Sequence, residues 1–429
     1  MPRRKPTLRN RNHRSPKIPS HSQSSEQPSE EDLPEQLIEL TVTAVANGGA
    51  CVARYDGRVV FVRHTLPGER VLARVTGSGS RGRFWFADVV EIIDPAPQRV
   101  DAPCQLAGPG GCGGCDYQHV ALDEQRRWKS EVVAEQLQRL GGIAVDVPIR
   151  ALPGSSDGLG WRSRIRYAVN ESGQVGFHQY RSDQVVPVDR CLIASPEIQQ
   201  AEVADELVSA RDWSGYPEVV VAEGSEETVV AAVPAKRNGK AGRLPAATLV
   251  EHAVGRDWEV AIDGFWQVHS AAADTLCDEV TSACTQADVI WDLYCGVGLF
   301  AGALAQQRRR NVTAVEGDRR AAEQARQNLA DLTGVQVVRR DVGTWVESPR
   351  GKSPDAVVLD PPRRGAGEAV LTQINRTKAQ RIVYVACEPA SLGRDTGVLR
   401  KQGWTMSSVQ AFDMFPMTHH VESIAVFDR

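Results

Sequence analysis

The chain has 429 residues, which is enough for two or three domains rather than a single core. Its formal net charge of −4 excludes a global positive field, so any binding to nucleic acid depends on local basic surfaces. No apolar run approaches the ~20 residues of a membrane span and no secretory signal opens the sequence, so we expect a cytoplasmic protein without a membrane partner. We also expect a monomer.

Residues 1–34 run from Arg/Lys-rich sequence into Ser, Pro and Glu, with almost no apolar side chains. A segment of this composition cannot bury enough surface to fold, so we predict a disordered tail. The sequence leaves open whether this tail is merely solvated or tethers RNA phosphates.

Short alternating runs separated by glycine turns occupy residues 35–96. About five closely spaced strands of this kind predict a small β-barrel. Arg81 and Arg83 accompany the aromatic run 84–86, a mixture suited to phosphate pairing and base stacking. The alternative is that the aromatic rings fill the barrel core and the arginines are solvated.

Residues 97–255 predict a mixed α+β central domain. Helical spacing over about 120–141 stops at a pair of glycines, which is a typical helix end, and we expect this helix to pack on the catalytic domain. Basic and aromatic side chains then interleave between residues 161 and 181, as on an RNA-binding face.

Four of the nine cysteines form a candidate metal site. Cys104, Cys112 and Cys115 lie in a glycine-rich loop, and Cys191 joins them from downstream. An odd, scattered set of cysteines does not indicate a disulfide framework, whereas closely spaced thiolates are typical of metal sites. A structural zinc site and an iron–sulfur cluster both fit this chemistry.

Residues 256–429 alternate apolar runs with helix-like stretches, which predicts a Rossmann-like, doubly wound α/β domain. Residues 403–427 predict two further strands. The expected parallel strands are 289–294, 311–315, 335–339, 356–359 and 381–386.

The ends of these strands carry candidate ligand-binding residues. Gly296 and Gly298 form a turn that lets the backbone approach a ligand, and Glu316 stands where an acid binds ribose hydroxyls. Asp341 ends the next strand, where it can meet an adenine. Asp360 opens an Asp-Pro-Pro turn, which is stiff and projects a carboxylate into the crevice. NAD would fit the first turn as well, but the Asp-Pro-Pro turn favours methyl transfer.

Cys387 ends the fifth strand, and Glu422 follows a loop near the end of the chain. Uracil C5 is a poor nucleophile until a thiolate adds to C6, and a base must afterwards remove the C5 proton. The pair therefore predicts C5 methylation of a uridine, with Cys387 as nucleophile and Glu422 as base.

Three motifs, Asp-Pro-Pro-Arg, Cys-x-Pro-Ala-Ser-Leu-x-Arg-Asp and Asp-Met-Phe-Pro-x-Thr-x-His-Val-Glu, make the chain from about residue 37 to 427 resemble the RNA 5-methyluridine methyltransferases (the RumA/TrmA family). The resemblance implies an N-terminal TRAM barrel and a class I methyltransferase domain. It assigns Cys387 and Glu422 the roles above, and S-adenosylmethionine as methyl donor. It further implies that the donor is held by Gln267, Tyr294, Glu316, Asp341 and Asp360, and that the four cysteines hold a [4Fe-4S] cluster.

The resemblance to members with a barrel and a cluster favours ribosomal RNA over tRNA as the substrate. The sequence departs from the family at Glu388, where Asn is usual, and at Leu299; we expect the Glu388 charge to oppose thiolate formation at its neighbour. The alternatives are a tRNA 5-methyluridine methyltransferase, an RNA methyltransferase acting on exocyclic amines, and a non-catalytic RNA-binding iron–sulfur protein.

Overall fold

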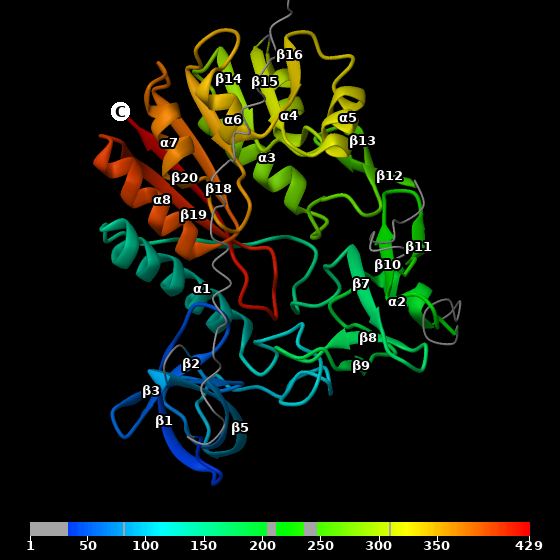
Figure 1. Ribbon diagram of the computed structural model, residues 1–429, viewed down its shortest axis with the longest axis vertical. Coiled ribbons are helices and arrows are strands. Elements are labelled where there is room, and N and C mark those ends of the chain that lie inside the picture. Colours follow the sequence, from blue (N-terminus) through cyan, green and yellow to red (C-terminus); the bar gives the residue numbers. More distant parts are fainter. Residues whose placement is uncertain (1–32, 80–81, 204–211, 236–246, 309) are drawn as a thin grey trace, which may run out of the picture.

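The computed structural model describes residues 33–79, 82–203, 212–235, 247–308 and 310–429. Arg81 and all but the last two residues of the predicted tail therefore lie outside the described residues. A mostly parallel sheet with helices on its faces forms the upper part of the molecule in Figure 1, above a small barrel and a β-rich central part. It is the sheet predicted for the methyltransferase domain and is called the methyltransferase sheet. Within the described ranges no helix is long and apolar enough to span a bilayer.

The N-terminal part is a closed five-stranded barrel with the order β1-β2-β3-β5-β4 (Figure 1). Side chains alternate between its interior and its surface, as the sequence pattern predicted: Ile38, Leu40 and Val42 of β1 are buried and the residues between them are exposed. The predicted barrel is confirmed. Its strands are β1 (Ile38–Val45), β2 (Cys51–Tyr55), β3 (Arg58–Arg63), β4 (Arg70–Ser78) and β5 (Phe84–Asp94).

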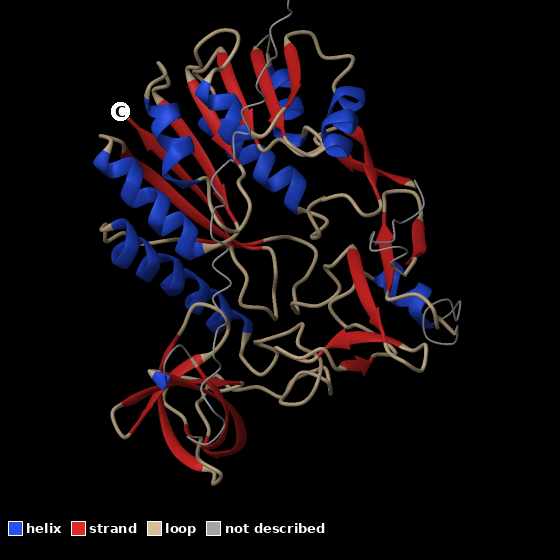
Figure 2. Ribbon diagram, viewed as in Figure 1, coloured by secondary structure: helices blue, strands red, loops and turns tan. Residues whose placement is uncertain are grey.

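Helix α1 (Leu122–Gln136) continues through a π-helical turn (Leu137–Gly141) and stops at Gly142, whose φ of 68° only glycine adopts readily. This helix packs against α8 (Pro389–Lys401) of the methyltransferase part (Figure 2). The short strand β6 (Ile149–Ala151) then joins the methyltransferase sheet. Part of the predicted central domain thus lies with the catalytic sheet.

The rest of the central region is a five-stranded sheet and a hairpin. The sheet order is β11-β10-β7-β8-β9, and β12 pairs with β13. The boundary expected after residue 255 falls in the turn of that hairpin. The elements are β7 (Arg164–Val169), β8 (Val175–His178), β9 (Val185–Pro187), α2 (Pro196–Val203), β10 (Glu218–Glu223), β11 (Thr228–Val233), β12 (Thr248–Ala253) and β13 (Arg256–Ala261).

The methyltransferase sheet has eight strands in the order β16-β15-β14-β17-β18-β20-β19-β6. The five predicted parallel strands are confirmed, and β20 runs antiparallel between β18 and β19. Strands β17 and β18 are almost wholly buried because helices cover both faces (Figure 2). The strands are β14 (Val289–Leu293), β15 (Asn311–Glu316), β16 (Val335–Arg339), β17 (Ala356–Leu359), β18 (Arg381–Ala386), β19 (Thr405–Asp413) and β20 (Glu422–Asp428), and the remaining helices are α3 (Ala272–Ala283), α4 (Leu299–Gln307), α5 (Arg319–Asn328), α6 (Val342–Glu347) and α7 (Gly367–Asn375).

Candidate active site

Most of the predicted site residues lie at one edge of the methyltransferase sheet. Carboxyl ends of parallel strands meet at a common edge, and ligands of open α/β sheets bind in the crevice beyond it. The structure brings together at this edge Tyr294, Gly296 and Gly298 after β14, Glu316 at the end of β15, Asp360 after β17 and Cys387 after β18.

The turn after β14 has a backbone that few side chains permit. Tyr294, Gly296 and Gly298 all have φ in the left-handed region, at 67°, 54° and 97°. A Cβ on Gly298 would meet Leu329 at 2.7 Å, so this glycine permits close packing behind the turn, whereas a Cβ on Gly296 would meet no atom within 4 Å. The turn therefore leaves open space beside Gly296.

Glu316 is held rigidly across this turn. Its carboxylate accepts hydrogen bonds from the N–H groups of Gly296 (3.0 Å) and Asp318 (2.7 Å). Asp341 instead caps α6, because one of its oxygens accepts from the Thr344 N–H and hydroxyl, and the Thr344 N–H bond lowers the pKa of that carboxyl. Part of the hydrogen-bonding capacity of Asp341 is thus used within its own helix.

Four carboxyl groups interact with one another at this edge of the sheet, those of Asp292, Glu316, Asp360 and Glu422. Burial, and then the charge of Asp360, raises the pKa of Asp292 to about 8. Burial, and then the charge of Glu316, raises the pKa of Asp360 to about 7. Burial followed by Asp360 also raises the pKa of Glu422 well above its ordinary value. Such a concentration of carboxyl groups favours a ligand that brings positive charge to this edge. Asp292 was not singled out from the sequence, where it looked like an ordinary strand residue.

Cys387 and Glu422 lie opposite one another. Strands β18 and β20 are antiparallel neighbours with Ala386 paired to Ser423, so the residues one step further along each strand face each other. The pKa of the Cys387 thiol is raised to about 12, first by burial and then by the nearby Glu422 and Asp360 carboxylates. The thiol is half-buried and the Glu422 side chain is buried.

The Glu388 carboxylate, expected to oppose thiolate formation at Cys387, forms hydrogen bonds with other groups. Its carboxylate caps α8 by accepting from the Ala390 N–H (3.3 Å), and it also accepts from the Asn47 side chain (2.9 Å) in the β1–β2 loop of the barrel. The carboxylates that most strongly raise the pKa of Cys387 are Glu422 and Asp360, not this neighbour. Glu388 thus links the barrel to the N-terminus of α8, directly after Cys387, through a pairing across 341 residues of sequence that no local pattern reveals.

Gln267 lies in the loop between β13 and α3 and is buried. Two residues before it, Phe265 is 70% exposed, which is unusual for a large apolar side chain. Trp266, between them, packs into the core beneath β13. The loop therefore has one fixed and one solvent-facing side chain.

The loop that leads into Glu422 is fixed by the cysteine-bearing segment. The N–H groups of Asp116 and Tyr117 both donate to the Met417 carbonyl (3.0 Å each), and the Asp116 carboxylate accepts from His419 at 2.6 Å. At the start of the loop, the fully buried Lys129 of α1 pairs with Asp413 at 2.6 Å. These contacts hold the loop that leads into β20, the strand that begins at Glu422.

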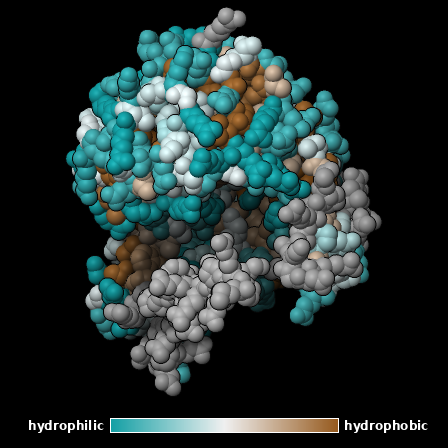
Figure 3. Space-filling model, turned by 45° about the horizontal axis from the view of Figure 1, so that its top comes forward, coloured by the Kyte–Doolittle hydropathy of each residue, from teal (hydrophilic) through white to brown (hydrophobic). Residues whose placement is uncertain are grey.

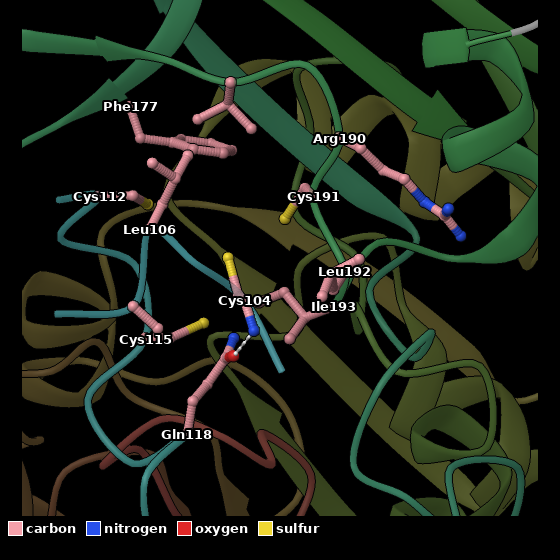
Figure 4. Close-up of a pocket in the computed structure, with 12 residues that line it drawn as sticks. Cys104, Leu106, Cys112, Cys115, Gln118, Phe177, Arg190, Cys191, Leu192 and Ile193 are labelled. Carbon is pink, nitrogen blue, oxygen red and sulfur yellow. Dashed lines mark hydrogen bonds between the residues drawn. The ribbon is translucent and has the colours of Figure 1, made fainter. Parts of the chain in front are cut away.

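The four predicted metal-binding cysteines line one small cavity (Figure 4), which also brings Cys191 to the three cysteines of the glycine-rich loop. The Gly114 N–H donates to the Cys112 sulfur at 3.3 Å, and Gln118 accepts from the Cys104 N–H at 2.9 Å. However, the described part of the chain contains no group of three or more His, Cys, Asp or Glu residues arranged to hold a metal ion. The metal assignment therefore stays a prediction.

Three family models match the chain. Residues 34–90 match the TRAM domain, residues 269–386 the methyltransferase small domain, and residues 352–429 the tRNA (Uracil-5-)-methyltransferase family. The crystal structure of Pyrococcus abyssi tRNA (uracil-54, C5)-methyltransferase with S-adenosyl-L-homocysteine has the same fold, with a TM-score of 0.69 and 23% identity over 90% of this chain and all of that one.

Curated relatives extend over nearly the whole chain. An uncharacterized RNA methyltransferase of Streptomyces avermitilis is 41% identical over 91% of this chain and 98% of its own length. The 23S rRNA (uracil(1939)-C(5))-methyltransferase of Alkalilimnicola ehrlichii is 32% identical over 92% of this chain and 98% of its own length. Together with the order of the matched domains, these similarities show that the chain belongs to the RNA (uracil-C5)-methyltransferase family.

Proposed function

We propose that the protein methylates C5 of a uridine, with S-adenosylmethionine as methyl donor, through a transient covalent bond between the Cys387 sulfur and C6 of the uracil. The main support is the pairing of β18 with β20, which sets a thiol and a carboxyl group face to face in the crevice. This arrangement meets the requirement of the reaction for a nucleophile and a base that reach one ring.

S-Adenosylmethionine supplies an electrophilic methyl group on a positively charged sulfur. The buried carboxyl groups of the crevice suit such a ligand, because opposite charge stabilises their ionised forms. Glu316 is positioned to accept from ribose hydroxyls, and the space beside Gly296 admits the ligand. We assign Gln267, Tyr294, Asp341 and Asp360 to the same binding site.

The reaction begins when the Cys387 thiol, whose pKa is raised by burial and by the Glu422 and Asp360 carboxylates, loses its proton to solvent. The positive charge that the donor would bring opposes the effect of these carboxylates. The thiolate adds to C6, and the displaced electron pair makes C5 nucleophilic. C5 takes the methyl group as the bond between methyl and the donor sulfur breaks. The Glu422 carboxylate then removes the C5 proton, the C6–sulfur bond breaks, and 5-methyluridine and the thiolate are released.

We propose ribosomal RNA as the substrate, because the named rRNA enzyme resembles this chain over 98% of its length at 32% identity. Nucleoside mass spectrometry of rRNA and tRNA from a strain lacking the gene tests this. We expect one 5-methyluridine to disappear from the large-subunit rRNA and to return with the wild-type gene. Loss from tRNA alone would select the tRNA alternative, and no loss from either would contradict the proposal.

We also propose that Cys104, Cys112, Cys115 and Cys191 hold a [4Fe-4S] cluster. Their convergence on one cavity and the N–H···S bond to Cys112 suit thiolate ligands, since such bonds stabilise charged sulfur. A cluster distributes its ligands over several iron atoms, whereas zinc needs all four around one ion. It would crosslink the glycine-rich loop to the segment around residue 191.

Protein purified without oxygen is expected to be brown and to contain iron and sulfide in equal amounts. Cys191→Ser should lose most of the iron, because only this ligand comes from the distant segment. Cys284→Ser, which changes a buried cysteine of the α3 end, should retain it. Stoichiometric zinc without iron in the wild-type protein would contradict the assignment.

A further inference from the structure

A second cavity, of about 260 Å³, lies between the barrel and the loop joining β8 to β9. It is separate from the cysteine cavity and from the crevice of the methyltransferase sheet. Figure 3 shows the surface hollowed between the methyltransferase part and the remainder of the chain. The side chains that matter for the argument are Phe61, Phe84, Phe86, Asp88, Tyr180 and Arg181.

The aromatic rings of this cavity lie outside the barrel core. On β5, Trp85 and Ala87 face the interior, so the alternating Phe84 and Phe86 face outward and are only partly buried. They form an edge-to-face cluster with Phe61 of β3, with ring centroids 5.3 to 5.4 Å apart for the two perpendicular pairs. Packing of the barrel does not require apolar rings on its outer surface.

Two arginines border the cavity, Arg181 from the loop between β8 and β9 and Arg63 from the end of barrel strand β3. The Arg181 guanidinium lies 3.9 Å from the Phe86 ring centroid and is exposed, so it can move to another partner. Arg63 lies 3.7 Å from the Tyr180 ring centroid but is buried and paired with Asp116. The cavity thus has one available cation at its mouth and one fixed cation in its wall.

The cavity is linked by hydrogen bonds and an ion pair to the segments that carry Cys387 and Glu422. Asn47 lines it and donates to Glu388, the residue next to Cys387. Arg63 is joined through Asp116 to His419, which precedes Glu422 by three residues. An RNA strand whose target uridine reaches the thiol therefore passes close to this opening.

We propose that the cavity binds the base of an unpaired nucleotide near the target uridine, stacked on the phenylalanine cluster, while Arg181 pairs with its phosphate. The rings suit stacking with any base, because every base has a π face. Asp88 in the lining disfavours a phosphate inside the cavity, since both are anionic, so the phosphate stays at the mouth. This inference rests on the proposed RNA substrate.

The test is fluorescence anisotropy with the full chain and a labelled single-stranded oligouridylate and oligoadenylate, without methyl donor, at several salt concentrations. We expect Phe86→Ala to weaken binding on the order of tenfold with an unchanged salt dependence, as for loss of stacking. Arg181→Gln should weaken binding and reduce the slope of log K against log salt by about one. Tyr216→Ala and Arg429→Gln, an exposed tyrosine and an arginine stacked on Trp404 outside the cavity, should bind like the wild type.

Wild-type binding by both cavity variants would overturn the inference, and so would an effect of Arg181→Gln alone, which would indicate phosphate contact without stacking. If Phe86→Ala unfolds, a photo-crosslink from 4-thiouridine RNA to residues 82–88 or 179–184 of the wild-type chain decides instead, and its absence counts against the proposal. Because no donor or methylation enters these measurements, a chain that binds through the cavity but methylates no RNA would contradict the proposed function only.

Discussion

Cys387→Ala is expected to abolish both methylation and the covalent complex with RNA. The sulfur supplies the electron pair without which C5 stays unreactive, so turnover should fall on the order of 10⁴-fold or more. RNA containing 5-fluorouridine at the target makes the loss visible on a denaturing gel, because fluorine cannot leave as a proton does and the wild-type complex therefore accumulates.

Cys284→Ala is the matched control, since it removes a buried thiol at the end of α3 and should form the complex normally. An unchanged yield of complex in Cys387→Ala would refute the nucleophile. Full activity in Cys387→Ser would favour methylation of an exocyclic amine, which needs no thiol.

Glu422→Gln is expected to trap the enzyme on its RNA after methyl transfer. The amide keeps the shape of the buried side chain opposite Cys387 but cannot take the C5 proton, so turnover should fall roughly 10²–10⁴-fold. Radiolabelled methyl groups should therefore appear in the covalent complex on natural RNA, where the wild type shows almost none.

Glu388→Gln provides the control, because this glutamate adjoins the nucleophile in sequence yet bonds to α8 and Asn47. It should turn over within a few-fold of the wild type. Normal turnover in Glu422→Gln would require another base, and failure to form any complex would assign the glutamate to an earlier step.

The sequence predicted the catalytic sheet well because its strands are buried on both faces and read as continuous apolar runs. The barrel was predictable for the complementary reason, since alternation along β1 separates interior from surface. The three residues of β6 are too few to show any periodicity, and their pairing with β19 depends on the folded arrangement of α1.

The candidate site, too, could be predicted only in part. Residues that end strands, such as Glu316 and Cys387, could be placed at one edge from topology alone. Asp292 could not be recognised, because only the surrounding carboxyl groups distinguish it from other buried strand residues. The aromatic run 84–86 was ambiguous until its alternation separated the core tryptophan from the two outward phenylalanines.

The strand β6 has a practical consequence for dissecting the protein. Residues 256–429 taken alone would leave Ala411–Asp413 of β19 without the strand that pairs with them, which lengthens an open sheet edge, a site where chains aggregate. The same cut would remove Lys129 and leave the buried carboxylate of Asp413 without this counterion. A fragment that behaves well in solution must therefore retain α1 and β6, so the catalytic module of this chain is discontinuous in sequence.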